Sequence, residues 1–275
     1  FTGFKMTSKS PQIVFDKLSL YVEGRCYLDQ IELQLQEGQS LVIAGAPGSG
    51  KSFVLRLLLG MPGVSRSEVV EYEGEVLVEG VPILGVGPNR LQQLRMQMGS
   101  IMRGGGLIDN MDIRSNITLP LVYHFREHLN FEDINARCST LLAALGFAYL
   151  DEPGRRPVSL NNEEVLYVAL ARALINSPRI LLFDDPLLGL SPRAAARLLD
   201  FLFYHPEFGD QIQLHQNENR LVTRLLATTN LNYYLNRGDL FAVLKDQRLI
   251  LVGDRDEVLQ SRDPSVLNLL STKEL

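Results

Sequence analysis

The sequence predicts an α/β fold with an antiparallel β subdomain and a helical subdomain. Three observations lead to this fold class. A glycine-rich loop, residues 45–52, stands between an apolar run and a helical pattern. A second apolar run, residues 180–183, ends at the acids Asp184 and Asp185, and residues 12–35 alternate apolar and polar side chains as strands do. Buried strands that alternate with helices are typical of an α/β core.

The glycine-rich loop is a complete G-x-x-x-x-G-K-S motif, and it has the strand before it and the helix after it that the motif requires. Its glycines let backbone N–H groups turn towards phosphate oxygens, and the helix start adds further unpaired donors. In such loops the lysine reaches the β- and γ-phosphates and the serine ligates Mg²⁺. We therefore expect a nucleoside triphosphate and Mg²⁺ to bind at Gly45, Ala46, Pro47, Gly48, Ser49, Gly50, Lys51, Ser52 and Phe53.

The strands and helices follow in order along the chain. Strands are expected at 12–22 and 27–35, a helix from 53 to 59, two short strands within 74–83, a helix at 89–98 and a strand at 99–102. The pattern is helical from 103 to 157, most clearly over 131–150, and a helix is expected at 162–175. A strand at 179–184, a helix at 192–204, an irregular segment at 205–220, a strand at 224–228, a hairpin over 241–252 and two short helices within 254–270 complete the order.

Composition narrows the class of protein. The 275 residues are 45% hydrophobic and 21% charged, with a mean hydropathy of +0.02, as in ordinary globular proteins. A net charge of −5 argues against a nucleic-acid partner held by positive charge. No uncharged apolar run approaches the roughly 18 residues that span a bilayer, and no signal-peptide pattern opens the chain. Cys26 and Cys138 are interpreted as buried thiols of a reducing compartment, so we expect a cytoplasmic protein.

Asp184 is the candidate second metal ligand. It ends a buried strand downstream of Lys51, where a phosphate-loop site places a carboxylate that helps to hold Mg²⁺. The alternative interpretation is a strand-end acid that only caps the next turn.

With Asp184 in place, the order of parts over residues 10–260 resembles the ATP-binding cassette (ABC) family. The resemblance implies a single ABC ATPase domain over residues 1–275, with a helical subdomain at about 104–175. It also implies ATP as the nucleotide and a head-to-tail dimer with a second ABC ATPase subunit, either identical or different. Such dimers sit on membrane permease subunits, so the resemblance places the chain peripherally on the inner face of the cell membrane.

Residues 104–121 look like the corresponding segment of the ATPase subunits of MCE-type (Mla-like) lipid transporters. That resemblance implies an MlaE-like permease as partner and lipid as cargo, and the ATPase of another ABC importer is the alternative. Docking on the permease is expected near residues 103–124. The apolar residues of this stretch are either contact surface or subdomain core: Leu107, Ile108, Met111, Ile113 and Leu121.

Five positions depart from what the family has at its functional motifs. Arg103 replaces the glutamine that senses Mg²⁺, and arginine has only donors to offer. The signature L-S-G-G-Q aligns with Leu160 followed by Asn161, Asn162, Glu163 and Glu164, and a carboxylate at this point would repel a triphosphate. The same residues suit a helix start, with Asn161 as N-cap and Glu164 three residues on.

The other three departures affect the chemistry of hydrolysis. Asp185 stands for the catalytic glutamate and is one methylene shorter, which costs rate if the carboxylate is misplaced by about 1 Å. Thr229 stands for the switch histidine and cannot act as acid or base near neutral pH, and Ser191 stands for an aspartate. The aromatic that would stack on adenine is assigned to Tyr21, one position from its aligned place, while Tyr27 is interpreted as a core strand residue.

We therefore expect the nucleotide-binding subunit of an ABC transporter, with ATP hydrolysis weak or absent. The alternative from another functional class is a non-hydrolysing structural or regulatory mate of an active ATPase. The helical insertion argues against a soluble phosphate-loop kinase, and the lack of basic patches argues against an RNA-associated cassette protein.

Overall fold

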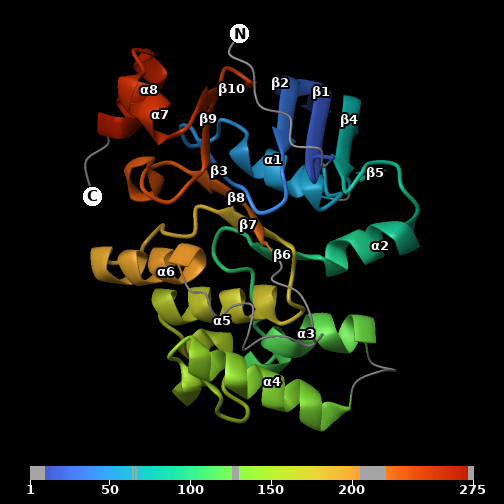
Figure 1. Cartoon of the computed structure of the whole chain (residues 1–275). Helices are drawn as coiled ribbons and strands as arrows, with labels where there is room; N and C mark the ends of the chain where they lie inside the picture. The colour runs from blue at the N-terminus through green and yellow to red at the C-terminus, as the bar shows by residue number, and fades with distance from the viewer. Residues whose placement is uncertain (1–9, 64, 66, 126–129, 205–220, 272–275) are drawn as a thin grey trace. The chain divides into compact units, whose positions relative to one another are not determined.

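The computed structural model describes residues 10–63, 65, 67–125, 130–204 and 221–271, so the segment 205–220 expected to be irregular lies outside the described residues. The chain divides into two compact units, 1–91 with 229–275 and 92–228 (Figure 1). The mixed α/β fold class is confirmed. The helices expected within about 104–175 belong to the second unit, and one domain over residues 1–275 stays a prediction.

The first unit contains an antiparallel sheet in the order β2-β1-β4-β5, which matches the predicted β subdomain. Its strands are β1 (Ile13–Val22), β2 (Arg25–Leu35), β4 (Val70–Val78) and β5 (Val81–Pro82). Phe15 pairs with Leu33 on one side and Val76 on the other, and these three apolar side chains are buried, whereas residues 71–75 of β4 are exposed.

One boundary in this sheet differs from the sequence prediction. Gly74 was expected to open a strand, but β4 begins at Val70 and carries Gly74 in its interior with φ 77°. A Cβ atom at Gly74 would lie 2.4 Å from the carbonyl oxygens of Asp16 and Lys17, where the β1–β4 register shifts. The glycine therefore marks an irregular point inside the strand rather than its start.

The first unit also holds the strand that leads into the glycine-rich loop. This strand, β3 (Ser40–Ala44), is fully buried and runs parallel to β9 (Leu240–Lys245), which forms the predicted hairpin with β10 (Arg248–Gly253). Four further helical segments complete the unit: α1 (Lys51–Leu58), η4 (Asn232–Tyr234), α7 (Arg255–Gln260) and α8 (Pro264–Ser271). The helix α2 (Pro88–Met96) leaves this unit and continues into the second.

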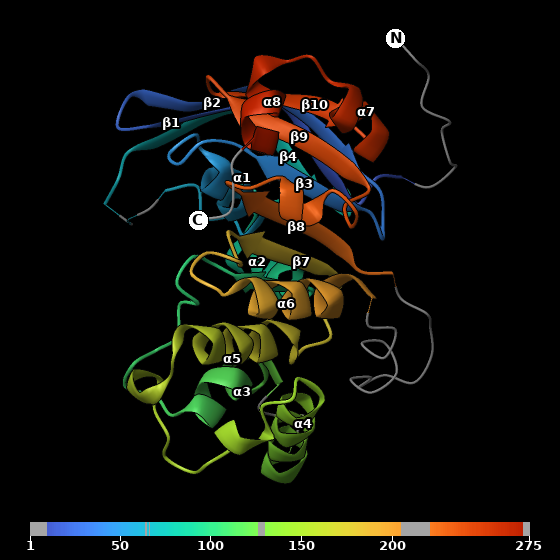
Figure 2. The same cartoon turned by 90° about the vertical axis from the view of Figure 1, so that its left-hand side faces the viewer.

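The second unit combines three parallel strands with a group of helices. The strand β7 (Ile180–Asp184) pairs with β6 (Met98–Ile101) on one side and β8 (Thr223–Thr228) on the other. The helices are α3 (Ile113–Phe125), α4 (Phe131–Ala144), α5 (Asn162–Leu174) and α6 (Pro192–Tyr204), with the short turns η1 (Ala148–Leu150) and η2 (Pro157–Ser159). Figure 2 shows α5 between α6 and the pair α3 and α4.

The predicted helix over 131–150 is shorter in the structure. Asn130 caps its start by accepting a hydrogen bond from the Asp133 N–H, and α4 ends at Ala144. Gly146, with φ 80°, turns the chain into η1, because glycine adopts this left-handed conformation without a side-chain clash.

The apolar residues of 107–121 divide between core and surface. Ile113 and Leu121 are 0% exposed and belong to the core of the helical group, whereas Leu107, Ile108 and Met111 remain partly exposed. Of the five residues that the sequence offered as contact surface or core, these last three are available for contact with another protein. Among the described residues, no helix combines the length and the apolar character needed to cross a bilayer.

Candidate functional site

The glycine-rich loop encloses the lysine that its motif predicts. Lys51 is 4% exposed, and its Nζ donates hydrogen bonds to the carbonyl oxygens of Gly45 at 2.7 Å and Ala46 at 2.8 Å. A longer contact of 3.4 Å joins Lys51 Nζ to Ser49 Oγ. The ammonium group of Lys51 has three protons to donate, and the loop itself accepts them. The positive charge that would face a bound phosphate therefore lies inside the loop.

Two glycines are required by close backbone approach in this loop. A Cβ atom at Gly45 would lie 2.6 Å from the Leu244 carbonyl oxygen. At Gly50, which has φ 105° at the start of α1, it would lie 2.9 Å from the Tyr27 carbonyl oxygen. The loop backbone thus approaches the backbone of β9 at Gly45 and of β2 at Gly50 so closely that a side chain does not fit at either position.

A cleft of about 420 Å³ lies beside the loop, wholly within the first unit. Loop residues 45–49 form one wall, and the remaining walls come from β2, from the β9–β10 turn and from α8. Their residues are Arg25, Cys26, Tyr27, Val243, Leu244, Lys245, Asp246, Gln247, Pro264, Ser265, Asn268 and Leu269. The size is that of a small-molecule site.

The aromatic residue in this cleft is Tyr27, which sequence reasoning assigned to the strand core. Its ring lies 4.5 Å from the ring of Phe53 on α1, and the Arg25 guanidinium lies 5.3 Å above it. Tyr21 is on β1 opposite Cys26 and does not line the cleft. Adenine stacking by Tyr21 stays a prediction, and Tyr27 is the aromatic that the cleft offers.

The turn between β9 and β10 is tied to β2 by two hydrogen bonds from different parts of the chain. The Asp29 N–H donates to the Gln247 carbonyl oxygen at 2.8 Å, and Arg248 Nε donates to Asp29 Oδ2 at 2.9 Å. This wall of the cleft is therefore fixed to the strand that carries Tyr27.

In the second unit, the structure pairs two of the departing positions with each other. Arg103 Nη2 donates to Asp185 Oδ2 at 2.8 Å, and the Asp185 side chain is only 6% exposed, against 50% for Arg103. Asp185 has φ 49°, and its N–H donates to the Ala227 carbonyl oxygen at 2.9 Å, which fixes the carboxylate at the end of β7. The carboxylate predicted to stand at the catalytic position is thus held in an ion pair.

Asp184, one residue earlier, is buried at 4% exposure. Its Oδ1 atom is buried and, across the described part of the chain, finds no hydrogen-bond partner. A carboxylate oxygen without a partner in a buried position is one that a cation would satisfy. Carboxylate oxygens are ligands that Mg²⁺ prefers, and its binding by Ser52 and by Asp184 stays a prediction.

The segment after Arg103 is fixed to helix α5. Gly104, Gly105 and Gly106 all have positive φ, from 59° to 77°. Arg172 on α5 donates to the carbonyl oxygens of Gly105 and Gly106, at 2.7 Å each. Burial lowers the pKa of the Arg172 guanidinium.

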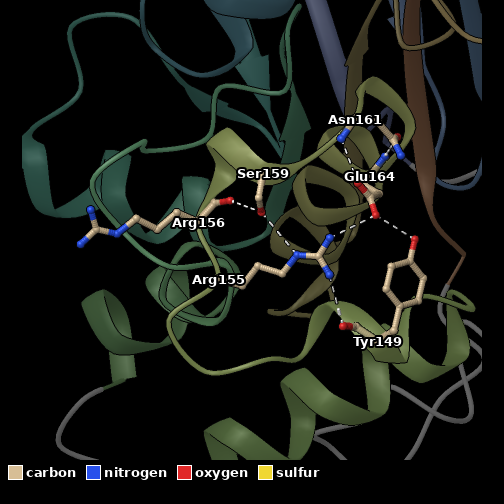
Figure 3. Close-up of polar contacts among 6 residues, drawn as sticks. All are labelled: Tyr149, Arg155, Arg156, Ser159, Asn161 and Glu164. Carbon is tan, nitrogen blue, oxygen red and sulfur yellow. Dashed lines mark hydrogen bonds and ion pairs between the residues drawn. The ribbon is translucent and has the colours of Figure 1, made fainter.

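The signature segment forms the predicted helix cap. Asn161 Oδ1 accepts from the Glu164 N–H at 3.0 Å, and Glu164 Oε2 accepts from the Asn161 N–H at 2.8 Å, which is a complete capping box at the start of α5. Glu164 is 7% exposed and also accepts hydrogen bonds from Tyr149 Oη at 3.0 Å and Arg155 Nη2 at 3.4 Å (Figure 3). Asn162 is exposed and Glu163 half-buried on the first turn of α5.

Two remaining positions have clear local surroundings. Ser191 directly precedes α6, and its Oγ accepts from the Ala194 N–H at 3.3 Å, so the serine caps the start of the helix. Thr229 directly follows β8 and is half-buried. Sequence reasoning missed the Arg103–Asp185 pair and the α8 wall of the cleft, because no local pattern connects residues so far apart.

Comparison with known proteins identifies a matching family and several similar chains. The family model described as ABC transporter matches residues 28–188. The intermembrane phospholipid transport system ATP-binding protein MlaF of Haemophilus influenzae is 24% identical over 246 residues, 90% of this chain and 85% of that protein. The methionine import ATP-binding protein MetN 2 of Pseudomonas entomophila is 31% identical over 183 residues, 66% of this chain and 51% of that protein.

A solved structure supports the same fold. It is a dimeric post-hydrolysis state of an ATP-binding cassette bound to ADP and Pi, with a TM-score of 0.70 at 23% identity. The match covers 86% of this chain and 96% of that one. At this identity the likeness concerns the fold.

Proposed function

Since the chain belongs to the ABC transporter family, whose model matches residues 28–188, we propose that it binds ATP with Mg²⁺ and hydrolyses it slowly or not at all. It serves as the ATP-binding subunit of a transport system for lipid. The observation that carries the proposal is the combination of an intact phosphate-binding loop with a catalytic-position carboxylate held by Arg103.

Binding is supported by the geometry of the first unit. The loop carries every residue of its motif, Lys51 lies inside it, and a cleft of about 420 Å³ opens beside it. In the second unit, Asp184 Oδ1 is buried and unpartnered among the described residues, which supports the predicted role of this carboxylate as a Mg²⁺ ligand. If bound there, Mg²⁺ would be held in part by Asp184 and would neutralise phosphate charge.

Weak hydrolysis follows from what surrounds Asp185. A carboxylate that is to take a proton from water must have a lone pair directed at that water. Arg103 Nη2 instead donates a hydrogen bond to Oδ2 of Asp185 at 2.8 Å, so the guanidinium engages this oxygen. Thr229 supplies no acid or base at the switch position, so two groups needed for turnover are missing from the same chain.

The signature segment works against hydrolysis at the partner's site as well. In the family's head-to-tail dimer, each signature faces the phosphates bound by the other subunit. Here Glu164 is engaged with Asn161, Tyr149 and Arg155, and Glu163 adds a second carboxylate in the same turn. A homodimer therefore has two damaged sites, and a heterodimer has one site without base and switch and one with this faulty signature.

The cargo and membrane partner are proposed from sequence likeness. The match to MlaF spans 90% of this chain, and residues 104–121 resemble the same group of transporters, so lipid cargo and an MlaE-like permease are favoured. The match to a methionine import ATPase keeps another importer as the second candidate. Leu107, Ile108 and Met111, which are partly exposed, are the contact residues proposed for the permease.

The experiment for hydrolysis is a steady-state ATPase assay on the purified chain and on its native complex. Arg103→Gln removes the cation from Asp185 while restoring the family's residue, and we expect it to raise the rate by about tenfold, since a positioned general base contributes on the order of 100-fold or more when fully effective. Arg103→Lys is the matched control, because it keeps a positive charge beside Asp185 and should leave the rate low.

Two results would contradict the proposal. A homodimer of the unmodified chain that turns over at about 1 per second or faster would lie in the ordinary enzyme range. No binding of ATP-Mg to the unmodified chain up to millimolar concentration would remove the nucleotide from the proposal altogether. The cargo is tested by identifying the permease that co-purifies with the native complex. An amino-acid permease in place of a lipid permease would favour the second candidate, the ATPase of another importer.

A further inference from the structure

The cleft beside the glycine-rich loop has one wall that comes from the far end of the chain. Pro264, Ser265, Asn268 and Leu269 line it, and all four belong to α8. The segment that matches the family model ends at residue 188, well before this helix begins. Neither the phosphate-binding motif nor the family match therefore accounts for the α8 wall.

Several contacts hold α8 beside the cleft. Val266 is 2% exposed and anchors the helix in the core of the first unit. Asn232 Nδ2 donates to the Leu270 carbonyl oxygen at 2.8 Å near the other end of the helix. Asp263 Oδ1 accepts from the Ser265 N–H at 2.7 Å, and this hydrogen bond lowers the pKa of the Asp263 carboxyl. The wall is thus a fixed part of the unit.

The walls of the cleft divide by chemistry. Loop residues 45–49 present the backbone of a phosphate-binding loop. The other walls carry the Tyr27 ring, with the Arg25 guanidinium 5.3 Å above it, and Asn268 is among the residues that line them. With the phosphates on the loop, the base and ribose of a nucleotide remain to be placed against these other walls.

We propose that α8 is a nucleoside-reading element of this site and that Asn268 is its specificity-determining contact with the base or ribose of the bound nucleotide. A side-chain amide has both donors and an acceptor, so it can form hydrogen bonds with the edge of a base or with a pair of ribose hydroxyls. The inference rests on the proposed function, in which the loop holds the phosphates of ATP.

The test separates the nucleoside from the phosphates. Isothermal titration measures ATP-Mg and inorganic tripolyphosphate-Mg against the full chain, Asn268→Ala and Leu267→Ala. We expect Asn268→Ala to weaken ATP binding by about tenfold, the size of one or two hydrogen bonds, and to leave tripolyphosphate binding unchanged. Leu267 is on α8, 48% exposed and outside the cleft lining, so Leu267→Ala should change neither.

The outcomes distinguish this inference from the function on which it rests. Lys51→Ala should weaken both probes, and if neither probe binds the unmodified chain, the proposed function fails and the inference with it. If tripolyphosphate binds but Asn268→Ala leaves ATP binding unchanged, only the inference is overturned. A gain in affinity for both probes in Asn268→Ala would also overturn it, because α8 would then obstruct the cleft.

A second measurement uses the unmodified protein and so does not depend on how a variant folds. Photolysis of bound 8-azido-ATP attaches the base to whatever lies beside it, and trypsin releases α8 within the peptide 263–273. We expect label in that peptide, and excess ATP should compete it away. Label confined to peptides without any α8 residue would refute the proposal.

Discussion

The capping box at the start of α5 provides a stability prediction whose size can be worked from the structure. Glu164→Ala removes a carboxylate that is 7% exposed and accepts three hydrogen bonds. The Asn161 N–H and the Tyr149 hydroxyl lose their partner at 2.8 and 3.0 Å, at about 1 kcal/mol each. The Arg155 contact, at 3.4 Å with 21% of its side chain exposed, adds less than about 1 kcal/mol. We expect the free energy of unfolding to fall by about 2–3 kcal/mol in total.

The assay is urea unfolding followed by far-UV circular dichroism, with Glu163→Ala as matched control. Glu163 lies on the same turn of α5, so its removal takes away the same charge near the helix N-terminus without the three hydrogen bonds. We expect Glu163→Ala to change the free energy of unfolding by less than about 0.5 kcal/mol. Glu164→Gln, which keeps an acceptor oxygen, should fall between the two.

The result that would refute the reasoning is a Glu164→Ala variant as stable as Glu163→Ala. The carboxylate would then contribute to stability only as an acid in the first turn of the helix. The Tyr149 and Arg155 contacts drawn in Figure 3 would carry no measurable free energy.

The remaining predictions concern a glycine pair and the two thiols. In urea unfolding, Gly105→Ala should destabilise the protein by about 1–3 kcal/mol more than Gly104→Ala. Both glycines have positive φ, but only a Cβ atom at 105 would lie close to another residue, 2.8 Å from Val165 Cγ1. Equal losses of stability in the two variants would contradict this close approach. Cys26 is partly exposed, whereas Cys138 is buried, and burial raises the pKa of the Cys138 thiol to about 12. At pH 8 an aromatic disulfide reagent should therefore label Cys26 in the native protein and Cys138 only after denaturation. Rapid labelling of both thiols in the native protein would show that Cys138 is accessible.

What the sequence determined by itself was set by short-range patterns. The phosphate-binding loop between strand and helix, the antiparallel strands at the start and the capping box of Asn161 with Glu164 all depend on residues a few positions apart. At such spacing the backbone geometry of a strand or helix fixes which side chains meet. The family resemblance followed from the phosphate-binding loop, the strand-end Asp184 and the order of parts, and the family match confirmed it.

Tertiary structure alone decided which distant residues share a site. Arg103 and Asp185 are 82 positions apart, and each was interpreted separately as a departure before the structure joined them in one ion pair. The α8 wall of the cleft lies more than 200 positions from the loop it faces. Ile113 and Leu121 were equally compatible with core and with docking surface, and their burial depends on how α3 packs against its neighbours. Such pairings are set by how the chain folds back on itself, and no spacing along the sequence encodes them.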